Sequence, residues 1–540
     1  MVLKIIFFFK GVGMSLETKK NNHYKKRVEK IKKKLSCYSD ESFLEKMFLH
    51  MKRAREPSDG IISNFPWCCF LALKWKFTVI NKKYTTHLSE SDFISIINSV
   101  YLLQDDAIDL SEDSNAILEM RRYIISQLQY QSPFKFDINT LSRQYGWFCC
   151  SESNYYKDCF YEVTRVKLED FYIISAYLII MCSDNCNADS KVIPYQHFII
   201  HLYPFFGLES LKGYLDFVSV KLNNIRAFMG AYKDEDELSV EYFRETPMLK
   251  KPIIITDDGL LILSKKILKS ALSSMVPNVL KYNIDNYKNK FGKLMEAYIG
   301  NIIKEINGDV VFEKEIKELY KENGIVGKSV DFLLKYDKST VFIESKAIEP
   351  DLVVKSTNTS RFLKDRLKNS FIKGINQGQE CASHLSKTDF YENSELDSLL
   401  IITHRDHYIS NGVMVDELID KKLFQCIEND LGKVWIDKKR IFYITIDEFE
   451  NLVYASNFNN IAVTDIISGY ANGEVDTLTR KGSLNEYLHS IVDNGIPDCK
   501  FVTDSRSRLS DALVGYISKS NHLWSGRINE YLYILNRILE

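Results

Sequence analysis

The sequence is short of the residues that loosen a chain. Only 10 prolines and 23 glycines occur in 540 residues, whereas 45% of the residues are hydrophobic and 13% are aromatic. Disordered chains bury too little apolar surface to fold and are poor in aromatics, so this composition excludes a largely unstructured protein. At roughly 150 residues per domain, the length allows two to four domains.

A large net charge and long apolar runs are also missing. The formal net charge is −1, so no global basic field marks a nucleic-acid-binding protein, although local patches decide phosphate binding. The apolar run at residues 5–9 is far shorter than the roughly 20 residues that span a bilayer, and no cleavage site follows it. We expect a cytoplasmic location, no membrane partner, and a true start at Met14.

Several motifs are absent as well. The 11 cysteines include no matched CxxC pairs, and Cys182 and Cys186 are too far apart to form one. Because Cys68, Cys69, Cys149 and Cys150 lie in apolar runs, the sequence predicts buried, reduced thiols. No P-loop, dinucleotide fingerprint or GxSxG motif supports nucleotide hydrolysis or a serine nucleophile.

The first half of the chain has a mostly helical pattern. Residues 1–40 form a basic N-terminal segment whose lysines and arginines cluster between 19 and 34; such a stretch either contacts phosphates or is a solvated helix face. Residues 41–284 carry apolar residues at helical intervals and are predicted to form a mainly α-helical domain of unassigned role, with a hairpin at 252–263.

Two histidines in this half have a spacing that can bind metal. His197 and His201 lie one helical turn apart, but no Glu or further His accompanies them. A core or interfacial pair is therefore the favoured interpretation.

The second half alternates helices with short apolar strands. The pattern predicts a helix at 291–306, strands at 310–316, 330–336 and 340–347, a helix at 361–385, and strands at 399–403 and 441–446. We therefore expect an α+β fold, with a central mixed sheet flanked by helices over residues 285–470 and a helical C-terminal extension over 471–540.

Charged residues interrupt two of these strands at one place. Asp331 begins one strand, and Glu344 and Lys346 end the next, which a short turn joins to the first as an antiparallel neighbour. Because side chains alternate faces along a strand, Glu344 and Lys346 point to the same side. Buried charge is costly, so this cluster predicts a function.

A divalent cation accounts for the cluster. Mg²⁺ or Mn²⁺ takes oxygen ligands, which Asp331, Glu344 and the Ser345 carbonyl can supply. Lys346 would then lie beside a metal-bound water, where it can lower the pKa of that water, orient it, or stabilise developing negative charge.

These residues resemble the PD-(D/E)xK, or restriction-endonuclease-like, nuclease superfamily. The resemblance covers roughly residues 285–450 and implies a core of a helix, three antiparallel strands, a helix and a further strand. It also implies catalytic roles for Glu296, as an additional metal ligand on the first helix, and for a glutamine on the second helix, Gln377 or else Gln379. Val330 stands where the family motif has proline.

A basic run follows the third strand. Neutralised phosphates give sequence-independent affinity for nucleic acid, so this run is a candidate nucleic-acid surface; a solvated helix is the alternative. It contains Lys355, Arg361, Lys364, Arg366, Lys368 and Lys373.

A second cluster competes for the catalytic role. His404, Asp406 and His407 follow a predicted strand, where a general base or a Zn²⁺ site is common. No third ligand follows closely, so the Asp331 cluster is favoured.

The sequence thus predicts a metal-dependent endonuclease that hydrolyses phosphodiester bonds, with DNA the favoured substrate. Helical extensions on such cores resemble bacterial or mobile-element defence nucleases, in which the helical region senses a protein partner or a trigger. The alternatives are a catalytically inactive nucleic-acid- or protein-binding module and a helical interaction scaffold. RNA as substrate, sequence specificity and homo-oligomerisation stay open.

Overall fold

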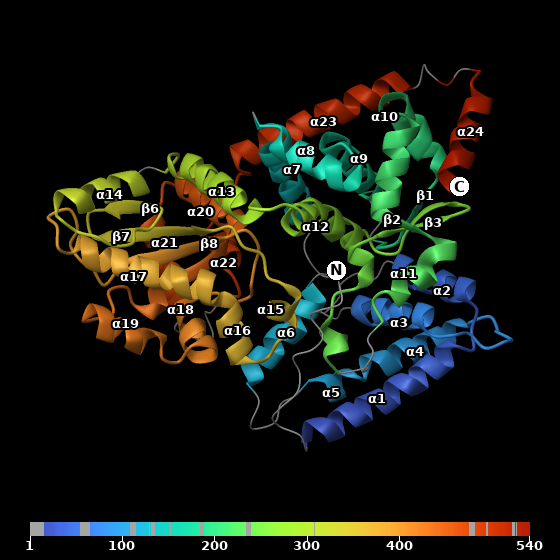
Figure 1. Cartoon of the computed structure of the whole chain (residues 1–540), viewed down its shortest axis with the longest axis horizontal. Coiled ribbons are helices and arrows are strands. Elements are labelled where there is room, and N and C mark those ends of the chain that lie inside the picture. Colours follow the sequence, from blue (N-terminus) through green and yellow to red (C-terminus); the bar gives the residue numbers. More distant parts are fainter. Residues whose placement is uncertain are drawn as a thin grey trace.

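The chain forms a mostly helical α+β structure with two separate sheets (Figure 1). The computed structural model describes residues 16–53, 65–108, 115–128, 130, 135–151, 153–183, 188–233, 239–306, 308–474, 481–492, 495–520, 524 and 526–540, without the side chains of 16–20, 135–137 and 352. The predicted start at Met14, the apolar head, Cys186 and the side chains of Lys19 and Lys20 lie outside these residues.

Helices dominate the first half, as the apolar periodicity predicts. They are α1 (Leu16–Leu35), α2 (Asp40–Lys52), α3 (Pro66–Thr78), α4 (Glu90–Tyr101), α5 (Gln104–Ala107), α6 (Ala116–Leu128), α7 (Lys135–Cys149), α8 (Tyr155–Thr164), α9 (Leu168–Cys182), α10 (Tyr195–Val218), α11 (Ile225–Gly230) and α12 (Lys265–Asn283). Ser89 caps α4, because its side chain accepts a hydrogen bond from the Asp92 N–H.

A small sheet lies among these helices. Its strands are β1 (Lys191–Ile193), β2 (Ser219–Lys221), β3 (Ile253–Thr256) and β4 (Gly259–Ile262), in the order β1-β4-β3-β2. The β3–β4 hairpin confirms the predicted one. Ser219 and Val220 interrupt the helical pattern of this half, because they follow the end of α10 and pair in parallel with Ile253 and Ile254.

The second half is built around a five-stranded mixed sheet. Its strands are β5 (Asp309–Phe312), β6 (Phe332–Tyr336), β7 (Ser339–Lys346), β8 (Ser398–Thr403) and β9 (Ile441–Thr445), and they pair in chain order. The first three strands form an antiparallel meander, and β8 and β9 add in parallel.

The helices of this half lie on both faces of the sheet and beyond its edges (Figure 1). They are α13 (Tyr287–Ile303), α14 (Glu313–Glu322), α15 (Leu352–Ser356), α16 (Ser360–Leu367), α17 (Lys373–Leu385), α18 (Gly412–Met414), α19 (Leu423–Leu431), α20 (Ile446–Asn459), α21 (Val463–Gly473) and α22 (Leu484–Ile491). A π-turn at Lys368–Ile372 links α16 to α17, so the predicted helix at 361–385 is confirmed with a local widening.

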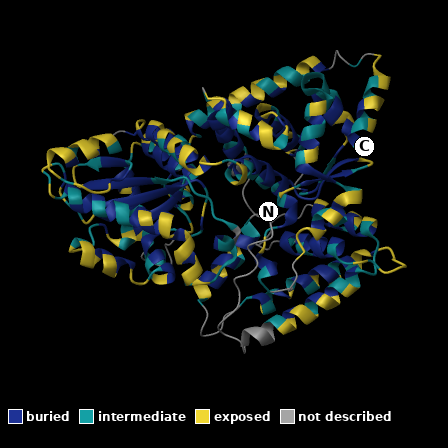
Figure 2. Ribbon diagram, viewed as in Figure 1, coloured by how far each residue is buried: buried dark blue, intermediate teal, exposed yellow. Residues whose placement is uncertain are grey.

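The two faces of the sheet pack into different cores because side chains alternate along each strand. Val341 and Ile343 pack with α13 and α20, whereas Phe342 packs with α16 and α17. The strands β6 to β9 are mostly buried, the edge strand β5 is half-buried to exposed, and the outer helix faces are exposed, as Figure 2 shows. Glu344 and Lys346 continue the α17 face beyond Phe342.

The predicted strand at 310–316 is wrong in its second part. Pairing ends at Phe312, and α14 begins at Glu313 inside what the sequence pattern suggested was strand and loop. The Glu315 carboxylate accepts a hydrogen bond from the Phe312 N–H, and Ile316 and Tyr320 form a buried stripe at the helical interval.

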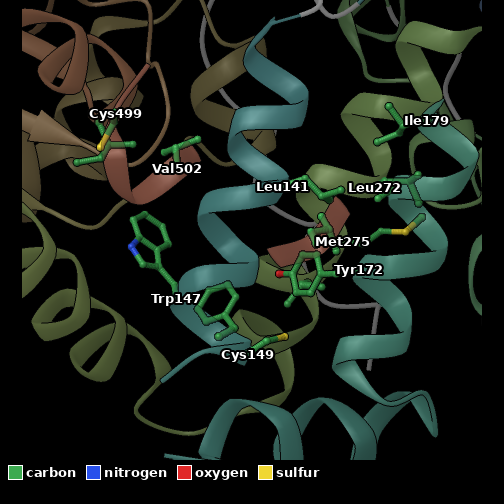
Figure 3. Close-up of a cluster of buried hydrophobic side chains, with 14 of the residues drawn as sticks. Leu141, Trp147, Cys149, Tyr172, Ile179, Leu272, Met275, Cys499 and Val502 are labelled. Carbon is green, nitrogen blue, oxygen red and sulfur yellow. The ribbon is translucent and has the colours of Figure 1, made fainter. Parts of the chain in front are cut away.

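The chain returns to its first half at its end. The last helices, α23 (Lys500–Ser520) and α24 (Ile528–Leu539), pack against α7, α9 and α10 of the helical half (Figure 1). Val502 of α23 joins a core that includes Leu141, Tyr172 and Leu272 (Figure 3). One hydrophobic core therefore runs from the helical half into the layer of α13 and α20 on one face of the five-stranded sheet.

Polar contacts also join the two halves. Arg143 of α7 is 1% exposed and pairs with Asp447 and Glu450 of α20, each at 2.6 Å. Arg121 of α6 donates to the backbone carbonyls of Val354, at 2.8 Å, and His407, at 2.6 Å.

The segment after β7 has further contacts with the helical half. The Lys355 ammonium pairs with Glu245 at 2.5 Å, and the Asn358 amide donates to the Glu119 carboxylate. We call residues 351–358, which these side chains and Arg121 hold, the strap.

Candidate functional site

Asp331, Glu344 and Lys346 meet at one end of the β6–β7 hairpin, as the sequence predicts. The pairing of Phe332 with Ile343 places Asp331 opposite Glu344. Asp331 lies one residue before β6 rather than inside it, because its carbonyl accepts a hydrogen bond from the Glu313 N–H at 2.9 Å. Its carboxylate accepts another from the Ser345 N–H at 2.6 Å.

The two carboxyl groups of the site are hard to ionise together. Burial raises the pKa of Asp331 to about 8, and the neighbouring Glu344 and Glu296 add to the shift. Burial also raises the pKa of Glu344, against the opposing effect of Lys346. A bound cation would reverse both shifts, because it stabilises the ionised forms.

One carboxylate oxygen of Glu344 has no hydrogen-bond partner. Glu344 is 2% exposed, and its Oε2 atom is buried without a hydrogen-bond partner. An unsatisfied buried carboxylate oxygen is costly, so it is a natural ligand position for a cation.

The acidic side chains do not form a ready-made cage. Among the described residues, no three His, Cys, Asp or Glu side chains are arranged to hold a metal ion. This arrangement still fits Mg²⁺, which proteins bind through one or two carboxylates while it keeps several waters.

Lys346 is held between the strand and the helix behind it. Its ammonium donates to the Glu344 carboxylate and, at 2.9 Å, to Oε1 of Gln377 on α17. Gly374 and Gly378 allow α17 to pack closely on β8, because a Cβ at Gly378 would lie 2.6 Å from the Leu399 side chain. Gln377 therefore positions Lys346.

The second candidate glutamine has a different role. Gln379 is fully buried, and its amide binds the backbone of Trp435 and Ile436. It ties α17 to the loop before β9 and does not reach the site.

Two further glutamates lie close enough to act on the site. Glu296 of α13 raises the pKa of Asp331, and burial, followed by Glu313, raises the pKa of Glu296 itself. Glu313 also raises the pKa of Glu344. Sequence reasoning missed Glu313 because it assigned this residue to a strand; the helical spacing of Ile316 and Tyr320 was the signal that could have found it.

The predicted basic surface is exposed but partly paired. Arg361, Lys364, Arg366, Lys368 and Lys373 are all exposed. Lys364 pairs with Asp420 at 2.8 Å and Arg366 with Asp351 at 3.5 Å. Lys373 lies one helical turn before Gln377 and lowers the pKa of Glu344, so it is the basic residue nearest the site.

The histidines of the competing cluster have separate partners. His404 pairs with Glu349 at 2.9 Å and packs against the ring of Phe291. The His407 Nδ1 lies 2.9 Å from the Arg405 carbonyl, and Asp406 accepts from the Tyr408 N–H. These contacts spread the cluster over three places, so it forms no common site.

The helical-half histidines are joined through a tyrosine. The Tyr177 hydroxyl lies 2.9 Å from the His201 Nδ1 and donates to the His197 carbonyl. This arrangement agrees with the structural interpretation of that pair.

No family model, curated protein or solved structure matches the chain. Within the described residues, no helix is both long and apolar enough to cross a membrane. Cys68, Cys69 and Cys149 are buried, as predicted, whereas the prediction of a buried thiol is wrong for Cys150, which is exposed.

Proposed function

We propose that this protein is a metal-dependent nuclease of the restriction-endonuclease-like kind, which hydrolyses phosphodiester bonds, with DNA as the favoured substrate. The observation that carries the proposal is the pair formed by half-buried Asp331 and buried Glu344, whose unpartnered Glu344 oxygen lies beside a lysine on the same strand. The order helix, antiparallel meander, helix, parallel strand supports it, because the resemblance of the sequence implied that core.

The residues present suit a hard divalent cation. Asp331 and Glu344 would hold Mg²⁺ or Mn²⁺ together with the Ser345 carbonyl and water, and Glu296 would add negative charge from α13. When bound, the ion supplies Lewis-acid activation of the phosphoryl oxygen and of a water.

In the proposed reaction, Lys346 acts on the attacking water and on the negative charge of the phosphate. Its ammonium, steadied by Gln377, would orient the attacking water and stabilise charge that develops on the phosphate. Burial of the surrounding carboxylates keeps bulk water from screening these interactions.

The substrate backbone would approach along α16 and α17. Arg361 and Lys368 are exposed and form no ion pair with another described residue, and Lys373 lies beside the acidic pair. Such residues contact phosphates without reading sequence. A role in defence, with the helical half as sensor, remains part of the proposal.

The experiment is a cleavage assay with a matched variant. The protein is incubated with supercoiled plasmid, linear DNA and RNA in Mg²⁺, beside Glu344→Gln, which keeps size and removes charge. We expect cleavage of DNA by the natural protein only, and calorimetric Mg²⁺ binding that Glu344→Gln abolishes.

Two results would contradict the proposal. Cleavage by the Glu344→Gln protein at the natural rate would remove this residue from the chemistry. Nucleic-acid binding without cleavage in either Mg²⁺ or Mn²⁺ would instead identify a non-cleaving binding module.

A further inference from the structure

The outer face of α1 carries a row of lysines that the proposed active site does not use. Lys25, Lys26, Lys30 and Lys33 are exposed, and none forms an ion pair or hydrogen bond through its side chain with another described residue. Their neighbours on the helix are different, since Arg27 pairs with Asp106 at 2.7 Å and Lys34 with Asp92 at 3.4 Å.

The geometry of the helix gathers these four cations. At about 100° of rotation per residue, they fall within an arc of about 140°, and they extend over about 12 Å of helix axis. The opposite face is an apolar stripe of Tyr24, Val28, Ile31 and Leu35, all buried against α3 and α4. Figure 2 shows the exposed face of α1 along the lower edge of the molecule.

A lysine-bearing loop lies beside the end of the helix. The Lys82 N–H donates to the Ser36 carbonyl and the Thr86 N–H to the Cys37 carbonyl, each at 2.9 Å, so the loop is fastened beside the end of α1. Lys82 and Lys83 are exposed, and the Tyr84 ring is 82% exposed.

We infer that Lys25, Lys26, Lys30 and Lys33, extended by the loop at 82–84, form a binding surface for the phosphodiester backbone of nucleic acid. A duplex presents one negative charge per roughly 1.7 Å of its axis, so a row of this length faces several phosphates at once. Tyr84 offers a stacking platform for an unpaired base. We call these residues the α1 surface.

The observations favour nucleic acid over a membrane. A helix that lies in a membrane interface inserts its apolar face, but the apolar face of α1 is already buried in the protein. The inference is independent of the proposed cleavage, because the α1 surface and the Asp331 site share no residue.

One acidic residue makes the α1 surface testable in both directions. Glu29 is exposed in the middle of the lysine arc. If phosphates bind there, Glu29 repels them, so Glu29→Gln should tighten binding whereas loss of the lysines weakens it.

The test measures binding in EDTA, where no cleavage can interfere. A fluorescent DNA duplex, a single strand of the same sequence and phosphatidylserine vesicles are titrated with the full chain between about 50 and 200 mM salt. The variant combines Lys25→Gln, Lys26→Gln, Lys30→Gln and Lys33→Gln. Its control combines Lys321→Gln, Lys338→Gln, Lys387→Gln and Lys519→Gln, which remove equal charge from scattered exposed positions.

For the duplex, we expect the α1 variant to reduce the magnitude of the slope of log affinity against log salt concentration by about 3 to 4. The control variant should keep a slope near that of the natural protein. Glu29→Gln should bind both nucleic acids more tightly. Tyr84→Ala should weaken the single strand at least about fivefold and leave the duplex unchanged.

Three results would overturn the inference. Equal effects of the α1 variant and its control would show that only net charge matters. Loss of vesicle binding with unchanged nucleic-acid binding would assign the surface to a membrane. Natural affinity of Tyr84→Ala for the single strand would remove the loop from the surface.

Discussion

Two clusters of buried charge in this protein are built on opposite principles. At the junction of the halves, the Arg143 guanidinium binds Asp447 and Glu450, and the Tyr298 hydroxyl donates to Glu450 at 2.6 Å. At the end of β7, the Lys346 ammonium donates to one oxygen of Glu344, and the other oxygen of this carboxylate is buried without a hydrogen-bond partner. The first cluster satisfies its members, whereas the second leaves acceptor capacity unused.

The difference separates a structural role from a chemical one. The buried, paired ions of the first cluster hold the two halves together. Removing one partner would leave an uncompensated buried charge. A carboxylate pair with raised pKa values is instead unfavourable unless a ligand arrives, which is typical of functional sites. Three predictions test this contrast.

The largest expected effect is on the rate of cleavage. Lys346→Ala should lower it by roughly 10²–10⁴-fold, as expected for a positioned proton-transfer group, equivalent to about 3–5 kcal/mol. Metal affinity should be kept or slightly raised, because a positive charge beside the acidic pair is removed. Single-turnover cleavage and calorimetric metal binding are measured on the same protein.

A conservative variant sharpens this test. Lys346→Arg should restore little activity, because a guanidinium is planar, bulkier and effectively never deprotonated. Cleavage by Lys346→Ala at the natural rate would show that the lysine only completes a pattern.

The second prediction concerns stability at the junction. Arg143→Met should lower the free energy of unfolding by about 3–5 kcal/mol, because Asp447 and Glu450 lose their buried counter-charge. Urea unfolding measures the loss. Arg527→Met is the matched control, since Arg527 pairs with Glu530 on the surface at 3.5 Å and should change stability little. Equal losses of unfolding free energy in both variants would mean that the Arg143 cluster stabilises the fold no more than a surface ion pair does.

The last prediction concerns a pH dependence at the site, whose effect is the smallest when it is counted for a single pH unit. The folded protein keeps the Asp331 proton up to about pH 8, whereas the unfolded chain releases it near 3.9. This difference stabilises the folded state fully below about pH 4 and is lost as the pH rises to about 8.

Asp331→Asn should therefore remove that slope. In EDTA, the variant should gain stability relative to the natural protein by up to about 1.4 kcal/mol for each pH unit between pH 5 and 8. Denaturant unfolding at several pH values measures it. Parallel stability curves for the two proteins would mean that Asp331 is ionised normally in the fold.

Local pattern was enough to predict much of this structure. Each of the strands β6 to β9 contains a short apolar run, and side-chain alternation alone places Glu344 and Lys346 on one side. The opposition of Asp331 and Glu344 follows from the short turn between the strands. Gln377 was found through the family resemblance, and its bond to Lys346 agrees with that choice.

Long-range partners could not be predicted in the same way. The three-residue strands β1 and β2 have too few residues to show a period, and they exist because β4 and β3 pair with them. Asp420 neutralises Lys364 from a distant loop, so the sequence overestimated the free basic charge of α16. Glu313 was missed for a local reason, since its apolar neighbours fit both a strand and a helix.

The strap gives the two halves a thermodynamic connection. It begins a few residues after Lys346, and Arg121, Glu119 and Glu245 of the helical half hold it. If a ligand displaces α6, the residues of the strap that Arg121 and Glu119 hold would move with it, and any resulting change of affinity at the end of β7 would couple the two places. Linkage is reciprocal. If a ligand of the helical half changes the affinity for a second ligand beside Lys346 by some factor, the second ligand changes the affinity for the first by the same factor.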